Sequence, residues 1–498
     1  GSVMSRESFD LIVIGGGPGG HAAAEEAARL GARTCIIEEH AWGGTCTHRG
    51  CVPTKALLTC SRRYADLKKL KRLGINPGDA GFDYAAFRRH REQMIRVSAL
   101  GVEKSLKEAG VAMKIGNGRI LSPGQVCYTS GAGASEVLEA SHLVIAWGAE
   151  PSWPSFVDLP RPPLGTYPQA MSHVLPAAGS APAAPESPWA DDEKKYAPDS
   201  AGLRPRRLLT SDAFLRLATM PQSVVILGGS VIGVEFATFL AEVGAKVEIV
   251  EMLPNIIPYE EEDAAVLLAK ELQRMGIKLH TSLSVNSLEE KAEGVVMAGE
   301  QHGKGVALEA EYALVCTGRR PRLDERSLRE LGIEHNRRGI TVNDRQETNV
   351  TGIYAVGDVT GGIMLAHRAR QQGRALANRL FGDGTVAYRE EAVPSVIYSH
   401  PPVARVGLTE RQAREKGWDI EIRRTDYGAN IMARTELAGQ GFAKFIFHDG
   451  RLVGATIAGE GAPELIAALA LAMTAGADLK TLQAWIIPHP TLSEILRL

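Results

Sequence analysis

The first forty residues alternate between short apolar runs and a glycine-rich turn. Residues 9–14 are mostly apolar and predict a buried strand that leads into the glycine-rich turn 15–20. The alanine-rich stretch 21–30 predicts a helix, and the apolar run 34–37 predicts a second strand ending in Glu38. A strand, a glycine turn, a helix, a strand and an acid in this order are typical of a dinucleotide-binding fold.

Four residues of this unit have separate expected roles. Gly15 permits the tight turn, and Gly17 lets the backbone approach a pyrophosphate. Gly20 lets the helix pack on the strand, and Glu38 would hydrogen-bond a ribose hydroxyl. A glycine pattern alone often marks an ordinary turn, but the surrounding strands and helix favour the nucleotide interpretation.

The same pattern recurs later in the chain. Residues 223–227 predict a strand, 228–233 a glycine turn, 234–243 a helix, and 246–250 a second strand that ends in Glu251. This repeat is the most informative fact about the organisation of the chain, because two such folds imply two dinucleotides.

The second turn keeps Gly228 and Gly233 but carries Ser230 in place of the middle glycine. An acid at Glu251 favours a free ribose 2′-hydroxyl and repels a 2′-phosphate, so NAD is preferred over NADP. The alternative for Glu251 is an ordinary charged residue at the end of a strand.

Two cysteines, Cys46 and Cys51, lie five positions apart next to a helix expected to begin near Pro53. A disulfide at this spacing requires a tight turn, which Gly50 permits. The helix N-terminus stabilises a thiolate on Cys51. This pattern favours a redox dithiol, and a dithiol beside two dinucleotide folds implies that one of the dinucleotides is a flavin.

His48 and Arg49, between the cysteines, are expected to lower the thiol pKa further. The alternatives are a buried cysteine pair or half of a zinc site. The adjoining sequence has no second Cys or His pair at ligand spacing, so we expect no metal.

Composition narrows the class of protein. The 498 residues are 44% apolar and 23% charged, which suits an ordinary globular protein of several domains. A formal charge of -2 gives no basic field for nucleic acid. Six scattered cysteines fit a reducing compartment, and the longest apolar run, 465–473, is too short for a membrane span. Residues 1–3, ahead of Met4, resemble an expression scar, and no signal peptide is visible.

The stretch 151–205 contains 12 of the 26 prolines. Proline removes backbone donors and disfavours helix, so we expect a long irregular excursion. We interpret it as a solvated linker or lid without chemistry, although loops of this length are often functional.

Beyond the second unit, a strand leads to Asp358, which precedes a helix containing His367. Asp358 is either a helix N-cap or a ligand for a polyol hydroxyl of a flavin side chain. Short strands follow residue 393, and 462–475 predicts an apolar helix, so we expect a separate α+β domain.

The chain ends with His489 before a proline, which holds that residue extended. Thr491 and Glu494 fit a capping box for the last helix, which makes a structural role for Glu494 one interpretation. The other pairs Glu494 with His489 to orient the imidazole.

Together, these features resemble the flavin-dependent pyridine nucleotide–disulfide oxidoreductases, and most closely the dihydrolipoamide dehydrogenases among them. The motifs that carry the resemblance lie at 15–20, 43–55, 228–235, 318–321, 354–358, 364–367 and 489–494, and they follow the order of the family.

The resemblance implies FAD on the first fold, NAD on the second, and a homodimer built by the C-terminal domain. It implies that Cys46 attacks substrate and that the Cys51 thiolate faces the flavin. Lys55 would lie near the flavin and pair with Glu235, and His489 with Glu494 would serve the dithiol of the other subunit. By the same resemblance, Thr45, Asp358 and Ala366 join the cofactor contacts of the first fold, and Gly318 those of the second.

The expected fold class is α/β, with two Rossmann-like dinucleotide-binding domains and a C-terminal α+β dimerisation domain. The expected boundaries are 1–150 for the first part of the FAD domain, 151–205 for the proline-rich insertion, 206–322 for the NAD domain, 323–390 for the second part of the FAD domain and 391–498 for the dimerisation domain.

Four features depart from the family pattern. His48 and Arg49 replace an asparagine and a small apolar residue, which could raise the potential of the disulfide. Trp147 occupies a threonine place near the nucleotides, Ile487 replaces a histidine, and ordinary members lack the insertion at 151–205.

The expected activity is NAD⁺-dependent oxidation of a dihydrolipoyl group on a protein of a 2-oxo acid dehydrogenase or glycine cleavage complex. One alternative is an NAD(P)H-dependent reductase of another disulfide or oxidant. The other is a flavoprotein docking subunit or redox sensor that binds a partner through 151–205. We expect a bacterial cytoplasmic protein, or a mitochondrial matrix protein after removal of a presequence.

Overall fold

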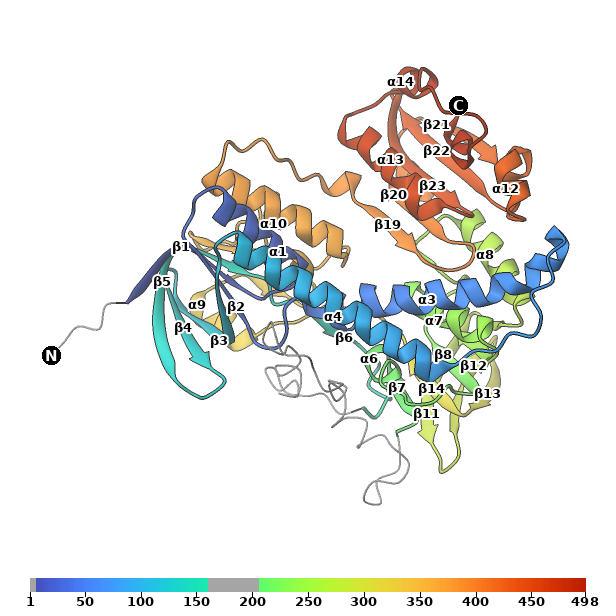
Figure 1. Ribbon diagram of the computed structural model, residues 1–498, viewed down its shortest axis with the longest axis horizontal. Coiled ribbons are helices and arrows are strands. Elements are labelled where there is room, and N and C mark those ends of the chain that lie inside the picture. The colour runs from blue at the N-terminus through green and yellow to red at the C-terminus, as the bar shows by residue number, and fades with distance from the viewer. Residues whose placement is uncertain (1–5, 160–205) are drawn as a thin grey trace.

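Three larger sheets of five or six strands, formed by the described residues, occupy separate parts of the molecule in Figure 1. The computed structural model describes residues 6–159 and 206–498, so most of the proline-rich stretch 151–205 lies outside the described residues. Within the described ranges, no helix has the length and apolar character needed to cross a bilayer.

The first sheet has a parallel core whose strands end together. Ile14 at the end of its first strand lies opposite Ile37 and Ile145, and Ala355 lies opposite Ile145. The shared edge at the carboxyl ends of these strands is where open α/β sheets bind ligands. Its strands are β1 (Glu7–Ile14), β2 (Thr34–Glu38), β3 (Ala112–Ser122), β4 (Gln125–Ser130), β5 (Ser135–Ile145) and β18 (Ile353–Ala355).

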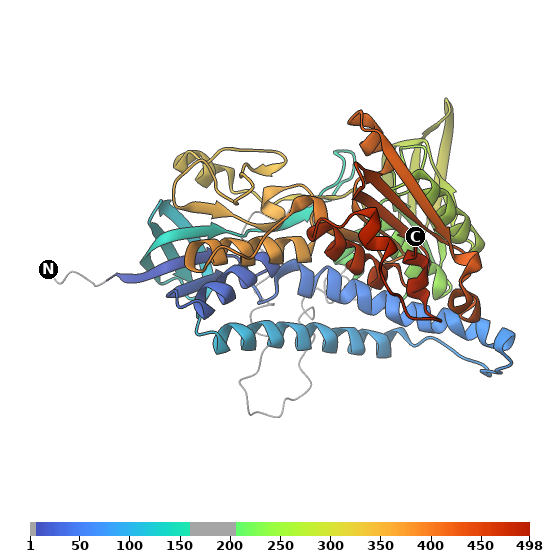
Figure 2. The same ribbon diagram turned by 90° about the horizontal axis from the view of Figure 1, so that it is seen from above.

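Two helices distant in sequence lie side by side against this sheet: α1 (Pro18–Arg29) and α10 (Ala366–Phe381), coloured blue and orange in Figure 1. The helix predicted at 21–30 begins three residues earlier than expected. Pro18 takes its first position, where a missing N–H costs no hydrogen bond. The two cysteines lie in successive helices, α2 (Gly44–His48) and α3 (Cys51–Asp66). The second of these, α3, runs beside α4 (Tyr84–Glu108) in both views (Figures 1 and 2).

The second sheet is wholly parallel, and its two predicted strands 223–227 and 246–250 form with the expected bounds. Its helix spans Val231–Glu242, three residues earlier than predicted at the start, because residues of the glycine turn already join it. In order, its strands are β10 (Lys278–His280), β9 (Lys246–Val250), β8 (Ser223–Leu227), β14 (Tyr312–Val315) and β7 (Leu208–Thr210); its helices are α6 (Ser211–Phe214), α7 (Val231–Glu242) and α8 (Glu262–Arg274).

Smaller elements complete these two units. A three-stranded antiparallel sheet flanks the second, and short strands before and after it pair with one another across the chain. These elements are β11 (Leu283–Glu290), β12 (Val295–Gln301), β13 (Lys304–Ala310), β6 (Ala149–Pro151), β15 (Arg319–Pro321), α9 (Glu325–Leu331), β16 (His335–Asn336) and β17 (Gly339–Ile340).

The third sheet is antiparallel and belongs to the last hundred residues, as the pattern of short strands predicted. The expected apolar helix spans Ala462–Thr474. The sheet order is β19 (Pro394–Ile397), β20 (Val403–Gly407), β23 (Arg451–Ala458), β22 (Phe442–His448) and β21 (Ile420–Asp426); its helices are α11 (Glu410–Glu415), α12 (Ile431–Thr435), α13 (Ala462–Thr474) and α14 (Leu479–Gln483).

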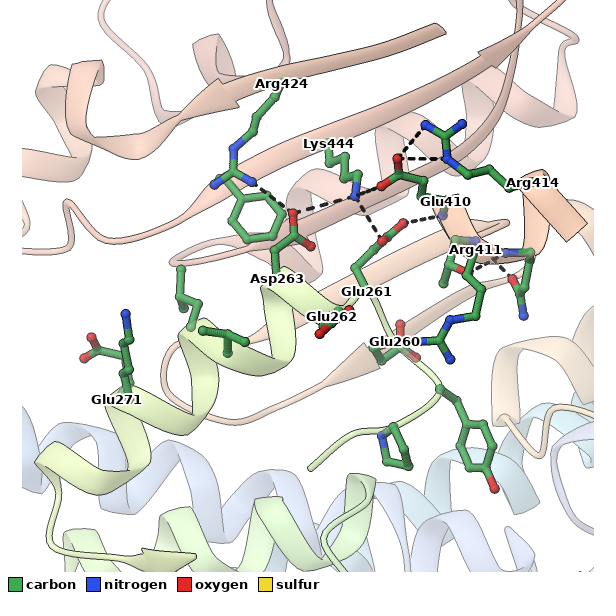
Figure 3. Close-up of a pocket in the computed structure, with 18 of the residues that line it drawn as sticks. Glu260, Glu261, Glu262, Asp263, Glu271, Glu410, Arg411, Arg414, Arg424 and Lys444 are labelled. Atoms are coloured by element: carbon green, nitrogen blue, oxygen red, sulfur yellow. Dashed lines mark hydrogen bonds and ion pairs between the residues drawn. The ribbon is translucent and has the colours of Figure 1, made fainter. Parts of the chain in front are cut away.

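A charged cluster joins the second and third units (Figure 3). The ammonium of Lys444, on β22, lies 2.8 Å from a carboxylate oxygen of Glu410, 3.1 Å from one of Glu261 and 3.6 Å from one of Asp263. Glu261 and Asp263 come from the start of α8, whereas Glu410 comes from α11. Because Lys444 is buried, its charge is balanced by residues of both units.

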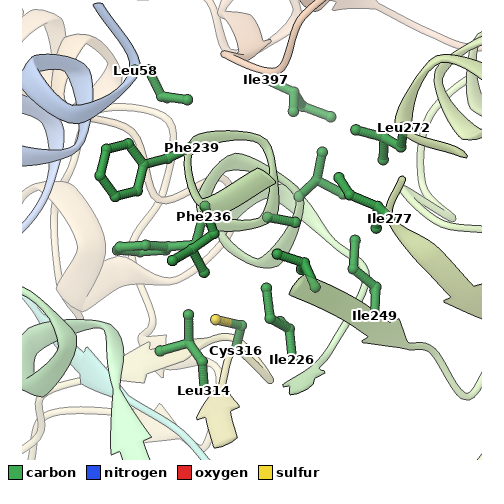
Figure 4. Packing of buried hydrophobic residues seen from close by; sticks show 14 of the residues in the cluster. Leu58, Ile226, Phe236, Phe239, Ile249, Leu272, Ile277, Leu314, Cys316 and Ile397 are labelled. Atoms are coloured by element: carbon green, nitrogen blue, oxygen red, sulfur yellow. The ribbon is translucent and has the colours of Figure 1, made fainter. Parts of the chain in front are cut away.

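One apolar core also crosses these boundaries (Figure 4). Phe236 and Phe239 of α7 and Ile226 of the second sheet pack in the same cluster as Leu58 of α3 and Ile397 of β19. Each of these side chains is at most 4% exposed. The helix that follows the dithiol is therefore held by a core that all three units share.

The charged cluster generates a stability prediction. Replacing Lys444→Met leaves three carboxylates without their shared cation, and we expect a loss of about 2–4 kcal/mol in the free energy of unfolding at neutral pH. This value is below that of a fully buried pair because Glu410 and Asp263 are each about one-third exposed. Lys480→Met, at an exposed lysine of the same unit, is the control.

The difference should depend on pH in a defined direction. Hydrogen bonds from Lys444 and Arg414 lower the pKa of Glu410, so its contribution is present above about pH 4.3 and disappears as the carboxylate protonates. Burial acts to lower the pKa of Lys444, but Glu410 and Glu261 outweigh it and raise that pKa. The contribution of Lys444 is thus present below about pH 10.4. Chemical denaturation should show the largest difference in free energy of unfolding between the parent protein and Lys444→Met at pH values between these limits. A difference at pH 3 as large as that at neutral pH would contradict this account.

Candidate functional site

A cavity of about 640 Å³ lies where the first sheet, the dithiol and the start of α7 meet. It brings together the predicted residues of the first nucleotide fold, of the dithiol and of the Lys55–Glu235 pair. The predicted residues that line it are Gly15, Gly17, Gly20, Glu38, Thr45, Cys46, Cys51, Lys55, Glu235, Asp358 and Ala366. Gly228, Gly233, Glu251, Gly318, His489 and Glu494 do not line it.

The first glycine turn fits a dinucleotide. Gly15 has φ +118°, and a Cβ on it would lie 2.0 Å from the carbonyl oxygen of Ala146. A Cβ on Gly20 would lie 1.9 Å from the carbonyl oxygen of Gly15, so both positions require glycine. At Gly17 a Cβ would meet only Gly44, at 3.9 Å, which leaves room for a phosphate at the N-terminus of α1.

Glu38 stabilises this turn from the end of β2. Its two carboxylate oxygens accept the backbone N–H groups of Gly16, at 2.5 Å, and His40, at 3.2 Å. Burial raises the pKa of its carboxyl, and these two N–H groups oppose the rise. Because each carboxylate oxygen can accept a second hydrogen bond, Glu38 retains the capacity to bind a ribose hydroxyl.

The second turn repeats this construction. Gly228 has φ +112°, and a Cβ on Gly233 would lie 1.9 Å from the carbonyl oxygen of Gly228. Glu251 accepts the backbone N–H groups of Gly229, at 3.2 Å, and Leu253, at 2.8 Å. The two turns therefore share their steric demands and their carboxylate brace, which fits a second dinucleotide.

The dithiol carries two different thiols. Cys46 lies in α2, Cys51 begins α3, and the two side chains are hydrogen-bonded as free thiols. The hydrogen bond from Cys46 and the cation of Lys55 lower the pKa of Cys51 to about 7, against opposing effects of burial and Glu235. The hydrogen bond to Cys51 and burial raise the pKa of Cys46. Cys51 is thus the thiolate of the pair.

The predicted effect of His48 and Arg49 on the thiols is wrong. The Nε2 atom of His48 lies 2.9 Å from the carbonyl oxygen of Trp42, and burial lowers the pKa of His48, which keeps it uncharged near neutral pH. Arg49 forms an ion pair with the buried Asp212 at 3.8 Å. The cation that lowers the pKa of Cys51 is Lys55, so the argument for a raised potential loses its basis.

Lys55 occupies a site with contacts on two sides. Its ammonium lies 3.2 Å and 3.4 Å from the oxygens of Glu235, as the motif predicted, and 4.1 Å from the ring centre of Tyr398. Glu235 is buried and also accepts the backbone N–H of Tyr398, at 2.8 Å. Sequence reasoning missed Tyr398, which belongs to no motif singled out in the chain.

Asp358 follows β18 at the edge of the cavity. The N-cap interpretation is wrong, because the short helix Gly357–Thr360 begins after Val356, and α10 begins after Leu365. Burial raises the pKa of the Asp358 carboxyl, and the cations of Arg319 and Arg368 oppose the rise. A half-buried carboxyl that lines the cavity fits a hydroxyl-rich side chain of a bound cofactor.

Arginines that sequence reasoning did not assign also line the cavity, and two of them act on groups described above. Arg319 donates to the carbonyl oxygen of Ala149 at 2.9 Å and is a cation near Asp358. Arg370, on α10, is the cation that opposes the raised pKa of Cys46. Trp147, the predicted departure near the nucleotides, lines the same cavity.

His489 and Glu494 form a pair of their own on the third unit. His489 Nδ1 lies 2.8 Å from a carboxylate oxygen of Glu494, and that oxygen also accepts the Thr491 N–H at 3.0 Å. Both interpretations of Glu494 are therefore correct, since it completes the capping box and orients the imidazole. The His489 side chain is 73% exposed, so within one chain it faces outward rather than into the cavity.

Comparisons with known proteins agree with this geometry. Residues 9–373 match the pyridine nucleotide-disulphide oxidoreductase family, and residues 393–498 match its dimerisation domain. Dihydrolipoyl dehydrogenases of Chlorobaculum tepidum and Bacillus subtilis are each 32% identical, over 98% of this chain and 96% of theirs.

A solved structure is similar as well. The Cu(II) complex of the HOCl-induced flavoprotein disulfide reductase RclA from Escherichia coli is 25% identical, covers 98% of both chains and superposes with a TM-score of 0.77. The expected fold class is confirmed, and the family implies FAD and a pyridine nucleotide. The chain belongs to the pyridine nucleotide-disulphide oxidoreductase family and is a flavoprotein disulfide oxidoreductase.

Proposed function

We propose that this protein oxidises protein-bound dihydrolipoyl groups with NAD⁺ through a Cys46–Cys51 redox disulfide. The observation that carries the proposal is the asymmetry of the two thiols. Lys55 and the hydrogen bond from Cys46 favour the thiolate of Cys51, whereas Cys46 is held as a thiol. The names of the relatives that are 32% identical over nearly the whole chain support the dihydrolipoyl substrate.

The thiol steps follow from these positions. A dihydrolipoyl thiol gives its proton to His489 of the partner subunit, and the resulting thiolate attacks the sulfur of Cys46. The Cys46–Cys51 bond breaks, Cys51 leaves as a thiolate, and a mixed disulfide joins substrate to Cys46. The second substrate thiol loses its proton to solvent, and its thiolate closes the lipoyl disulfide and releases Cys46, which recovers a proton from the partner's His489.

When bound, FAD supplies the two-electron transfer that links the reduced dithiol to NAD⁺. We assign its binding to 1–150 with 323–390, through Gly15, Gly17, Gly20, Glu38, Thr45, Asp358 and Ala366. We assign NAD to 206–322, through Gly228, Gly233, Glu251 and Gly318, with Glu251 disfavouring a 2′-phosphate.

A homodimer completes the proposed site. Residues 393–498 match a dimerisation domain, and they expose large apolar side chains: Leu471 on α13 is 70% exposed and Ile486 is 92% exposed. Such exposed apolar residues fit a surface that a second copy covers. His489 of one chain would then reach the dithiol of the other.

A second candidate is an NAD(P)H-dependent reductase of a different disulfide or oxidant. It is supported by the likeness to RclA, a flavoprotein disulfide reductase solved with Cu(II). The cation of Arg370 near Cys46 also suits an anionic substrate. The docking or sensor hypothesis depends on 151–205, of which 160–205 lies outside the described residues, and it stays a prediction.

Steady-state turnover distinguishes the two enzymes. We expect dihydrolipoamide with NAD⁺ to give the highest kcat/KM, and NADP⁺ to be at least about tenfold poorer because of the charge of Glu251. The same preparation is assayed with NADH against lipoamide, glutathione disulfide, a quinone and Cu(II). Turnover restricted to the last three acceptors would overturn the proposal in favour of the second candidate.

Substitution of the dithiol tests the assignment of Cys51. Cys51→Ser should lower dihydrolipoamide oxidation by at least about a thousandfold, because no disulfide can form. Cys60→Ser, on the same helix, is the matched control and should retain full turnover, since burial raises the pKa of Cys60. Full activity of Cys51→Ser with its flavin bound would rule out the scheme.

The proposed base is tested across subunits. His489→Gln should lower dihydrolipoamide turnover by about 10²–10⁴-fold, the usual contribution of a general base. Heterodimers of a Cys51→Ser chain and a His489→Gln chain contain one intact pair of Cys51 and the partner's His489. We expect them to recover about half of the activity per dimer, whereas a site within one chain predicts no recovery.

A further inference from the structure

Two buried carboxylates on α7 each connect α3 with the segment that follows β19. Glu235 binds the ammonium of Lys55 on α3 and accepts the backbone N–H of Tyr398. One oxygen of Glu242 accepts the hydroxyl of Ser61 on α3, at 2.8 Å, and lies 2.6 Å from Nδ1 of His400. Each carboxylate therefore bridges the same two parts of the chain.

The spacing of these contacts makes a repeated arrangement. Glu235 and Glu242 are seven residues apart, which places them on one face of α7 two turns apart. Tyr398 and His400 are two residues apart in the loop after β19, so both can face α7. The residues of the first bridge line the redox cavity. The second bridge lies outside the cavity lining, further toward the C-terminal end of α3.

Tyr398 adds a contact that the second bridge lacks. Its ring centre is 4.1 Å from the ammonium of Lys55, a distance at which a cation is attracted to an aromatic face. Burial, Glu235 and Cys51 raise the pKa of its hydroxyl, so the side chain is uncharged at neutral pH. Tyr398 therefore acts on Lys55 through its ring and not as a charge.

The charged and titratable groups around Cys51 are few. Cys46 faces it from α2, Lys55 from α3, Glu235 from α7 and Tyr398 from the loop after β19. Among these described groups, Lys55 is the only cation that acts on Cys51. Beside the hydrogen bond from Cys46, the position of the Lys55 ammonium consequently influences how strongly the thiolate of Cys51 is favoured.

We propose that Tyr398 is a positioning residue, whose ring and backbone hold the Lys55 ammonium between itself and Glu235, beside Cys51. We further infer that the Glu242–His400 contact fixes the loop that carries Tyr398. The inference rests on the proposed role of Cys51 as the reactive thiolate. It assigns to the third unit of the same chain a function at the dithiol, separate from the histidine it offers to the partner.

The test measures the pH dependence of Cys51 alkylation. Iodoacetamide is applied to the flavin-loaded protein in a Cys46→Ser background, and mass spectrometry follows the peptide that contains Cys51. Tyr398→Phe keeps the ring, whereas Tyr398→Leu removes it. Trp418→Leu is the matched control, because Lys416 lies 5.3 Å from that ring in the same unit, away from the cavity.

We expect the alkylation midpoint of Tyr398→Leu to rise by about 0.5–1 pH unit, the size of a lost cation–π contact. Tyr398→Phe and Trp418→Leu should retain the parent midpoint. Equal alkylation midpoints for Tyr398→Leu and Tyr398→Phe would overturn the inference. They would show that Tyr398 only fills apolar space, since the loss of its ring would then leave the pH dependence of Cys51 alkylation unchanged.

Glu242→Gln provides a second test that leaves the ring in place. Losing the charge that binds His400 should raise the midpoint in the same direction, and an unchanged midpoint would overturn the role of the second bridge. The absolute midpoint of Cys51 in the reduced protein that retains Cys46 tests the proposed function separately. A value at the ordinary thiol pKa, about 8.5, in that protein would contradict Cys51 as the thiolate. The difference between the 398 variants still decides the inference.

Discussion

The buried carboxylate of Glu235 is the constraint on which the redox centre depends. A carboxylate in an apolar helix is costly unless it is paired, and Glu235 is paired twice, with Lys55 and with the N–H of Tyr398. These contacts join three units that share one apolar core. The stable position of the Lys55 cation, and with it the thiolate of Cys51, is therefore a property of the packed molecule and not of the dithiol loop alone.

The elements that the sequence predicted well are those set by local pattern. The strands 223–227 and 246–250 agree with the structure residue by residue, because buried parallel strands are short apolar runs with clear ends. The helices after both glycine turns begin three residues before the predicted start. Apolar periodicity could not locate those starts. Proline and two glycines occupy the first turn of α1, and the first three residues of α7 belong to the glycine turn that was expected to precede the helix.

The site divides in the same way. Lys55 and Glu235 were paired correctly because the motif fixes them, whereas His48 and Arg49 were judged by proximity in sequence alone. Burial leaves His48 uncharged, and Asp212, from a distant segment, pairs with Arg49. Tyr398 could not be found from sequence, because its contact with Lys55 joins residues more than three hundred positions apart. Long-range contacts of this kind leave no local signal.

The position of β18 has a consequence for how the protein is made. This strand pairs with β5, although the whole second unit lies between them in the chain, and Asp358 follows directly after it. The first glycine turn leaves the ribosome early, but the sheet edge that faces the cavity is finished only after residue 358 has emerged. Because domains tend to fold as they are synthesised, the second unit should be folded before the first is complete. On the proposed assignment of the flavin to the first unit, flavin uptake is expected late in synthesis, and a chain that stops before β18 should fold its middle and still remain colourless.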